Sequence, residues 1–219
     1  METRLLDRIK WLGHDGFEIA ADGVTLMIDP FQVEGDRPAD IILVTHPHFD
    51  HCSIDDIARI RKPSTVIVTE PESAEKLSAA NLAGDIRIVK PGDSLTVSGI
   101  LIEAVAAYNM DKHFHPKEKN WLGFIVTLDG LRVYHAGDTD LIPEMNGLRA
   151  DIALLPVSGT YVMTADEAAA AAKRIKPRTA IPMHYDSIVG TTSDALAFKA
   201  ALADTCEIVI PYKVDIRKV

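Results

Sequence analysis

Short apolar runs dominate the pattern of hydrophobic and polar positions along the chain. Residues 8–13 and 17–30 alternate or cluster apolar positions on either side of Asp22-Gly23, a dipeptide that favours a tight hairpin turn. The segment 122–135 repeats this arrangement around Asp129-Gly130. Both segments are therefore predicted to form antiparallel hairpins.

Three apolar runs, 40–46, 151–157 and 178–185, continue almost without polar interruption and are followed by polar residues. A run of this kind predicts a strand that is buried on both faces, with the polar residues leaving at its end. Further strands are predicted over 64–69, 85–90, 100–108, 206–211 and 212–216.

Helix signals follow several of these strands. Ser53 with Asp56, and Thr164 with Glu167, have the spacing of a capping box, which predicts helices over 53–60 and 164–175. Helices are also predicted over 71–84, ending at Gly84, and over 193–204. Residues 109–121 are polar and lack a regular period, which indicates a loop.

The order of these elements is the same in both halves, where strands come first and strand–loop–helix units follow. This order predicts an α/β (α+β) fold in which two mixed sheets pack face to face and helices cover them, a four-layer αββα sandwich. A single domain is expected over residues 1–219. The polar clusters predict one site along the seam between the sheets.

The composition narrows the choice of partners. The formal net charge of −9 and the pI near 5.3 oppose bulk binding to nucleic acid, which requires a basic surface. No stretch reaches the roughly 20 apolar residues of a membrane span, and the charged start of the chain does not resemble a signal peptide. With only two cysteines, a reducing cytoplasmic location is expected. A homo-oligomer is compatible with these data.

Candidate chemistry concentrates in the stretch VTHPHFDHC, which holds His46, His48, Asp50 and His51. In an extended segment alternate side chains point the same way, so His46 and His48 can converge on one ion while the other two serve a second. Imidazole and carboxylate suit Zn²⁺, Mn²⁺, Fe²⁺ or Ni²⁺. The missing ligands should lie on other loops at the same edge.

Two later segments can supply such ligands. Asp138 lies in the Gly-containing turn of HAGDTD. His184, within PMHYD, lies at the end of a predicted buried strand. Together these residues predict a divalent metal centre with two ions per chain.

The stretch THPHFDH resembles the T-H-x-H-x-D-H signature of the metallo-β-lactamase superfamily. GDTD and PMH follow in the order of that family's later motifs, and Asp29-Pro30 precedes the signature as it often does there. The opening WLGHDGFEI resembles the G-H-[AS] segment of the small metal-dependent hydrolase branch. This branch is similar to L-ascorbate-6-phosphate lactonases and N-acylphosphatidylethanolamine phospholipase D.

The resemblance implies a metallo-β-lactamase-like fold and a set of ligands. His46 and His48 would bind the first metal, and Asp50, His51 and His184 the second, with Asp138 bridging both.

One position departs from the family pattern. The third histidine of the first metal should follow the strand 100–108, yet Asn109 stands there. Either His113 or His115 could fill this place, and we favour His115 because Pro116 would stiffen its loop.

Other residues have two interpretations each. His14 could support a ligand by a hydrogen bond or contact the substrate, and His135 is expected to pack or to support a ligand. Cys52 is expected to be a small buried apolar residue. Tyr161 either packs over the core or lines the pocket. The basic residues between Lys112 and Lys119 are either solvated or attract an anionic substrate.

The function implied is a hydrolase that directs a metal-activated hydroxide at a small ester, lactone or phosphodiester. Asp50 would orient the hydroxide and His115 could protonate the leaving group. A di-iron redox protein on the same fold is an alternative, although such proteins typically carry glutamate at the position of His48. The second alternative is a metal-binding sensor without catalytic activity.

Overall fold

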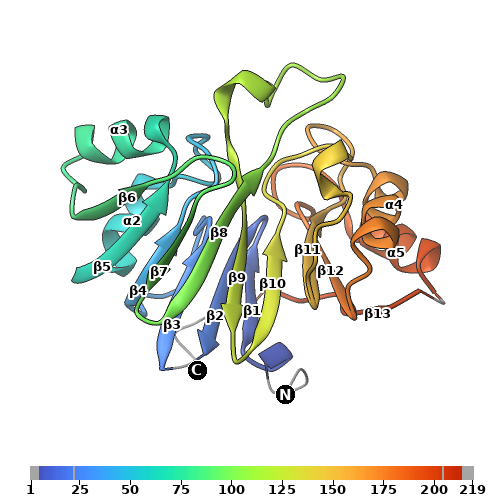
Figure 1. The fold of residues 1–219 in the computed structure, drawn as a ribbon, viewed down its shortest axis with the longest axis horizontal. Helices are drawn as coiled ribbons and strands as arrows, with labels where there is room; N and C mark the ends of the chain where they lie inside the picture. Colours follow the sequence, from blue (N-terminus) through green and yellow to red (C-terminus); the bar gives the residue numbers. More distant parts are fainter. Residues whose placement is uncertain (1–4, 22, 204, 214–219) are drawn as a thin grey trace.

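Two mixed sheets pack face to face at the centre of the computed structural model, which describes residues 5–21, 23–203 and 205–213 (Figure 1). The first has six strands in sequence order, with β1 to β3 antiparallel and β3 to β6 parallel. These strands are β1 (Ile9–Gly13), β2 (Gly16–Ala21), β3 (Val24–Ile28), β4 (Ala39–Leu43), β5 (Arg61–Thr69) and β6 (Asp85–Ile88). Helices α2 (Ile54–Ile60) and α3 (Pro71–Ala79) lie beside them.

The second sheet repeats this plan, since β7 to β10 are antiparallel and β10 to β13 are parallel. Its seven strands are β7 (Ser94–Val97), β8 (Ile100–Ala106), β9 (Leu122–Leu128), β10 (Leu131–His135), β11 (Ile152–Pro156), β12 (Thr179–Met183) and β13 (Glu207–Ile208). Helices α4 (Ala165–Ile175) and α5 (Thr192–Ala201) pack on it. The 3₁₀ turns η1 (Lys117–Lys119) and η2 (Pro143–Met145) lie in its connections.

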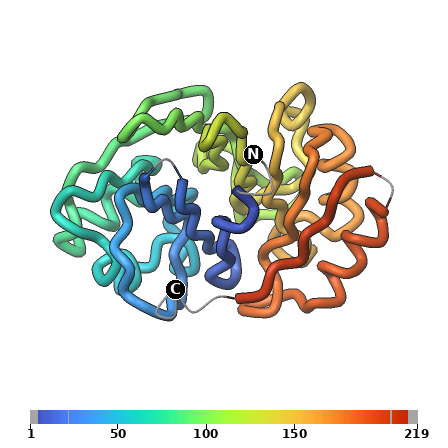
Figure 2. Tube along the Cα trace, turned by 90° about the horizontal axis from the view of Figure 1, so that it is seen from below, coloured from blue at the N-terminus to red at the C-terminus, as the bar shows by residue number. Residues whose placement is uncertain are grey.

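The described residues thus form the predicted four layers, with helices outside and sheets inside. Seen from below, the chain from β3 to β6 and the chain from β10 onwards lie on opposite sides of the molecule, with the start of the chain between them (Figure 2). Within the described residues, no helix has the length and apolarity needed to cross a membrane.

Strand β4 shows why the sheets stack this way. Ile41 and Leu43 point into the core between the sheets, whereas Ile42 and Val44 pack with the residues of α2 and α3. Successive side chains of a strand face opposite sides, so a continuous apolar run supplies both cores at once. The polar residues that begin at Thr45 therefore emerge at an edge that is covered on both faces.

Several boundaries differ from the prediction. The helix expected over 71–84 ends at Ala79, because Asn81 adopts a left-handed backbone with φ 58° and the Leu82 N–H closes on the Leu77 carbonyl at 2.9 Å. This bond pattern is the usual helix-ending motif with asparagine in place of glycine, so Gly84 lies beyond the end.

Other corrections concern strands. Strand β7 was not predicted, because its apolar run is short and only Val97 of its four residues is buried. The strand expected over 206–211 shrinks to the two residues of β13, and Tyr212 and Lys213 are not in a strand. The rest of 212–216 lies outside the described residues, as does the turn residue Asp22.

The two capping boxes have different outcomes. Thr164 and Glu167 make both reciprocal bonds at the start of α4, as predicted. At α2, Ser53 accepts a hydrogen bond from the Asp56 N–H, but the Asp56 carboxylate accepts from the N–H groups of Gln32 and Val33, at 2.9 and 3.0 Å. Asp56 therefore fixes the loop that follows β3.

The turn after β10 is unusually close to its neighbours. Gly137 has φ +63°, and a Cβ atom there would lie 2.5 Å from the Leu122 carbonyl oxygen. Only glycine fits this backbone without a shift. The turn delivers Asp138 to the edge of the sheet.

We expect Gly137→Ala to lower the free energy of unfolding by about 3 kcal/mol, because alanine costs about 1–2 kcal/mol in this backbone region and crowding adds about 1–3 kcal/mol. Gly130→Ala is the matched control, since its φ is +75° and nothing lies within 4 Å of its Cβ position. Urea unfolding measures both variants. Equal losses would contradict the close approach at Gly137.

Candidate metal centre

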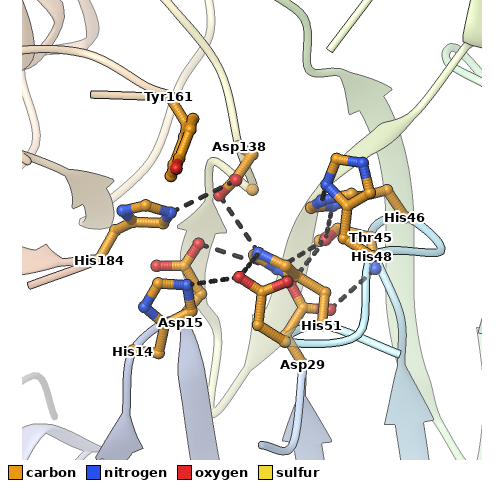
Figure 3. Close-up of polar contacts among 12 residues, drawn as sticks. His14, Asp15, Asp29, Thr45, His46, His48, His51, Asp138, Tyr161 and His184 are labelled. Carbon is orange, nitrogen blue, oxygen red and sulfur yellow. Dashed lines mark hydrogen bonds and ion pairs between the residues drawn. The ribbon is translucent and has the colours of Figure 1, made fainter. Parts of the chain in front are cut away.

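The candidate ligands lie on loops that leave the same edge of both sheets. His46, His48, Asp50 and His51 follow β4, Asp138 follows β10, and His184 follows β12 (Figures 1 and 3). The loop 107–121 between β8 and β9 reaches over this edge and brings His115 to it. Residues far apart in sequence therefore meet at the seam, as predicted.

A first cluster contains His46, His48 and His115, whose ligand atoms all lie within 4.8 Å of one another. Nε2 of His46 is 3.0 Å from Nδ1 of His48. Burial lowers the pKa of His46 well below its usual value and also lowers the pKa of His48. Both rings are therefore neutral at pH 7, which is the form that binds a metal ion.

Asn109 holds His115 in this cluster. Its Oδ1 accepts a hydrogen bond from the His115 backbone N–H at 3.0 Å and lies 3.1 Å from Nδ1 of the ring. Its Nδ2 donates to the Tyr161 carbonyl. The Nε2 atom of His115 is thereby directed at the cluster, while His113 is exposed on the loop.

A second cluster surrounds Asp138, which is 4 % exposed. Its Oδ1 lies 3.5 Å from Nε2 of His51, and its Oδ2 lies 3.4 Å from Nε2 of His184 and 3.1 Å from Nε2 of His115. Burial alone would raise the pKa of Asp138, but the three neighbouring histidines hold it well below its usual value. This carboxylate therefore lies between the two clusters.

Asp50 and His14 form a pair beside the second cluster. Oδ2 of Asp50 is 3.1 Å from Nε2 of His14 and 3.8 Å from Nε2 of His51. Burial would raise the pKa of Asp50, but its hydrogen bond with His14 and the charge of His51 bring it down to about 2. The ring of His14 also lies 4.1 Å from that of His184, so His14 contacts candidate ligands from both sheets.

The buried Asp29 carboxylate supports His51 from behind. It accepts hydrogen bonds from the Thr45 N–H and hydroxyl, at 2.8 and 2.6 Å, and its Oδ2 lies 2.8 Å from Nδ1 of His51. Burial would lower the pKa of His51, but Asp138 and Asp29 raise it well above its usual value. This contact leaves Nε2 of His51 directed toward Asp138 (Figure 3).

Three residues at the site have a left-handed backbone although none is glycine. The φ angles are 51° for His14, 44° for Asp29 and 61° for His184. Such conformations cost energy and persist where surrounding contacts hold them. Ser158 Oγ fixes the ring of His184 at 2.8 Å from Nδ1, and buried His135 supports the backbone carbonyl of Asp15 at 2.8 Å.

Asp15 was missed by sequence reasoning, because along the chain it is only a turn residue between β1 and β2. Its side chain is fully buried and belongs to the second cluster, with His51, Asp138 and His184. Only the folding of the β1–β2 turn against β10 and β12 reveals it.

The residues fit a divalent metal. Several buried atoms of these residues have no hydrogen-bond partner among the described residues: Nδ1 of His14, both oxygens of Asp15, Nε2 of His51, Nε2 of His115 and Oδ1 of Asp138. Buried polar atoms almost always have a partner, and cations satisfy imidazole and carboxylate donors of this kind.

A cavity of about 280 Å³ opens above the two clusters. His48, Asp50, His115 and Asp138 contribute to its floor, and Phe49, Phe114, Tyr161 and Ile188 to its walls. The hydroxyl end of Tyr161 points down toward Asp138 and His184 (Figure 3).

The lysines of the loop 107–121 are each matched by an acid. Lys112 lies 2.6 Å from Asp140, Lys117 2.9 Å from Glu144 and Lys119 2.6 Å from Glu72. The expected attraction of an anionic substrate by this basic run therefore loses its physical basis, since its charge is compensated.

Comparisons with known proteins show the family of this chain. The family described as beta-lactamase superfamily domain matches residues 8–184. A UPF0173 metal-dependent hydrolase of Methanoculleus marisnigri is 34 % identical over 92 % of this chain and 91 % of its own.

Solved structures share the fold. A protein of Parabacteroides distasonis described as a metal-dependent hydrolase superposes with a TM-score of 0.82 and 36 % identity, over 93 % of this chain and 91 % of its own. A metallo hydrolase of Ignicoccus hospitalis has a TM-score of 0.76 at 23 % identity, over 92 % of this chain and 93 % of its own, which shows a shared fold.

We expect His115→Ala to lower the metal content of the purified protein, because it removes one of the three imidazoles of the first cluster. His113→Ala is the matched control, since it lies two residues away and is exposed. Elemental analysis after dialysis against a defined level of Mn²⁺ or Zn²⁺ gives the metal content. Unchanged content in His115→Ala would remove this residue from the candidate ligands.

Proposed function

The chain belongs to the metallo-β-lactamase superfamily and is a metal-dependent hydrolase, and from this premise we propose that it cleaves a small ester, lactone or phosphodiester. The observation that carries the proposal is the pair of histidine and carboxylate clusters that share Asp138 beneath an open cavity. The cavity gives a small molecule access to both clusters.

The candidate ligands divide into two sets in this proposal. One set would hold a first cation and the other a second, with Asp138 between them: His46, His48 and His115 for the first, and Asp50, His51 and His184 for the second. Divalent ions such as Zn²⁺, Mn²⁺, Ni²⁺ or Fe²⁺ would supply Lewis acidity, which activates water and polarises the bond under attack.

Asp50 is the side chain that would accept a hydrogen bond from the attacking water and orient it. It faces the cavity, and its low pKa keeps it an acceptor at neutral pH. His14 fixes its orientation through the 3.1 Å contact, so the carboxylate presents a defined edge to a water above the second cluster.

His115 loses its expected role as a proton donor, because Asn109 engages Nδ1 and Nε2 faces Asp138. Tyr161 is the side chain that can donate a hydrogen bond in its place. Tyr161 lines the cavity, and its hydroxyl points toward Asp138 and His184, where it can donate a hydrogen bond to the oxygen on which charge develops (Figure 3).

The hydrolytic proposal is favoured over the redox and sensor alternatives by two features. His48 places an imidazole in the first cluster where the redox proteins typically carry glutamate. The clusters also lie at the floor of an open cavity that contains Asp50 and Tyr161, which a purely structural or sensing ion does not require.

We expect His48→Ala and Asp138→Ala each to reduce kcat/KM by more than about 100-fold, since even outer contacts of metal ligands contribute about 10–100-fold. Initial rates on a panel of phosphodiesters, lactones and simple esters, with Mn²⁺, Zn²⁺ or Ni²⁺ supplied, provide the measurement. Circular dichroism establishes that each variant is folded.

His113→Ala serves as the control in the same panel and should retain the wild-type rate. Full activity in His48→Ala or Asp138→Ala would contradict the assigned site. A metal-dependent rate confined to one class of substrate would identify the bond that is cleaved.

A further inference from the structure

Exposed apolar side chains gather around the mouth of the cavity. Phe49, Phe114 and Ile188 are 65 %, 50 % and 41 % exposed, and all three line it. They come from three separate loops, which follow β4, β8 and β12. Large apolar groups in contact with water are costly unless a partner covers them, and a concentrated group of them usually marks a binding site.

Contacts between aromatic rings orient Phe114 and Phe49. The ring of Phe114 meets that of Tyr161 edge to face with centroids 4.6 Å apart, and Phe49 meets Phe31 in the same way at 5.8 Å. Such pairs have a preferred geometry and resist rotation. The apolar walls are therefore formed before any ligand arrives.

The loop that carries Phe114 is also fixed. Glu72 of α3 accepts hydrogen bonds from Lys119 and from the indole N–H of Trp121, at 2.6 and 3.2 Å. At the other end, Asp140 accepts from the Met110 N–H and from Lys112. These bonds fix the position of the loop. They also compensate the charges of Lys112 and Lys119, so the mouth of the cavity is apolar and carries no excess positive charge from them.

We propose that the substrate carries an aromatic or branched hydrocarbon group next to the bond that is cleaved, and that Phe49, Phe114 and Ile188 hold this group. The proposal rests on the hydrolytic function above and narrows its substrate class. A cavity of about 280 Å³ lies just below the range of about 300–1,000 Å³ that ligand sites usually occupy. It suits a single ring or a short branched chain.

The first test measures binding and requires no turnover. Saturation-transfer NMR with the uncharged 3-phenylpropanamide should show contact between its ring and the protein, while propanamide should show none. Phe49→Ala and Phe114→Ala should each weaken the signal of the ring. Leu196→Ala is the control, because this residue is equally exposed but lies on α5, away from the cavity.

The second test measures preference in catalysis. In the ester class, we expect kcat/KM for p-nitrophenyl 3-phenylpropanoate to exceed that for p-nitrophenyl acetate by at least tenfold, because each buried methylene contributes about fourfold. The ratio should fall toward one in Phe114→Ala and stay unchanged in Leu196→Ala. Matched pairs of alkyl-substituted lactones and of aryl and methyl phosphodiesters extend the test to the other bonds.

The outcomes separate the two proposals. Hydrolysis without any apolar preference, together with no binding of 3-phenylpropanamide, would overturn the apolar site and leave the hydrolase in place. Ring binding without hydrolysis in any class would support the apolar site and contradict the proposed bonds. Sedimentation with phosphatidylcholine vesicles that is lost in Phe114→Ala, without ring binding, would show that the mouth contacts lipid surfaces and overturn the proposal.

A second inference concerns Asp15 and rests on a different observation. This carboxylate is fully buried, and neither of its oxygens has a hydrogen-bond partner among the described residues. The nearest histidine nitrogen, Nδ1 of His51, lies 3.9 Å away and already contacts Asp29. Burial and the neighbouring Asp138 carboxylate raise the pKa of Asp15 well above its usual value, so a proton or a cation must compensate this side chain. Its place among His51, Asp138 and His184 favours a cation.

We infer that Asp15 is an additional ligand of the cation held by His51, Asp138 and His184. One ligand atom of each of these four residues lies within 4.8 Å of the others. A further carboxylate makes this cluster richer in hard oxygen donors than the three-histidine cluster, which favours Mn²⁺ there over softer ions.

Mn²⁺ titration by calorimetry, with chelator competition, tests this ligand. Asp15→Asn keeps the shape and removes the charge, and it should weaken one class of site by at least tenfold while leaving the other unchanged. Glu70→Gln is the control, since Glu70 is an equally buried carboxylate outside the site. If Asp15→Asn does not fold, Asp15→Ser replaces it.

The melting temperature distinguishes a ligand from a structural residue. Without metal, Asp15→Asn should melt no lower than the wild type, because asparagine keeps the shape and carries no charge that burial would penalise. With saturating Mn²⁺ it should gain less stability than the wild type. A variant that is less stable in both conditions, with unchanged Mn²⁺ affinity, would overturn the inference.

Discussion

The buried carboxylates at the seam impose the strongest constraint on this molecule. Asp15, Asp29 and Asp138 are between 0 and 4 % exposed, and mutual repulsion would expel them unless opposite charge or hydrogen bonds compensate. Thr45 satisfies Asp29, and the histidines surround Asp138. The strand ends, the tight turn at Gly137 and the left-handed residues all serve to bring these groups together.

The same seam joins the two halves of the chain. The His184 N–H donates to the His14 carbonyl at 3.1 Å, and the Trp11 indole donates to that carbonyl at 2.8 Å. Trp11 also stacks on Tyr185, with ring centroids 4.8 Å apart. Since the candidate ligands come from both sheets, an ion that binds only the folded protein would stabilise this interface as well as the site.

Sequence patterns predicted most of the fold where one local signal decided the outcome. The continuous run at β4 and the capping box at α4 are such cases, whereas β7 lacked a periodic signal and the end of α3 depended on the backbone of Asn81. The residues of the candidate site also fall into those with a local sequence signal and those without one. The motif around His46 was visible locally, but the burial of Asp15 depends on contacts across the chain.

Phe49 stands between two candidate ligands, His48 and Asp50, whereas Ile188 lies in the loop between His184 and α5. Any change in the length or path of the first loop would displace metal ligands together with the apolar wall. The loop that carries Ile188 begins after the last ligand, so the side chain at 188 can change without moving His184. However, Gly190 packs closely against Ser158 and the His184 carbonyl and restricts the path of this loop. One wall of the cavity is therefore tied to the chemistry in both composition and path, and another is tied in path alone.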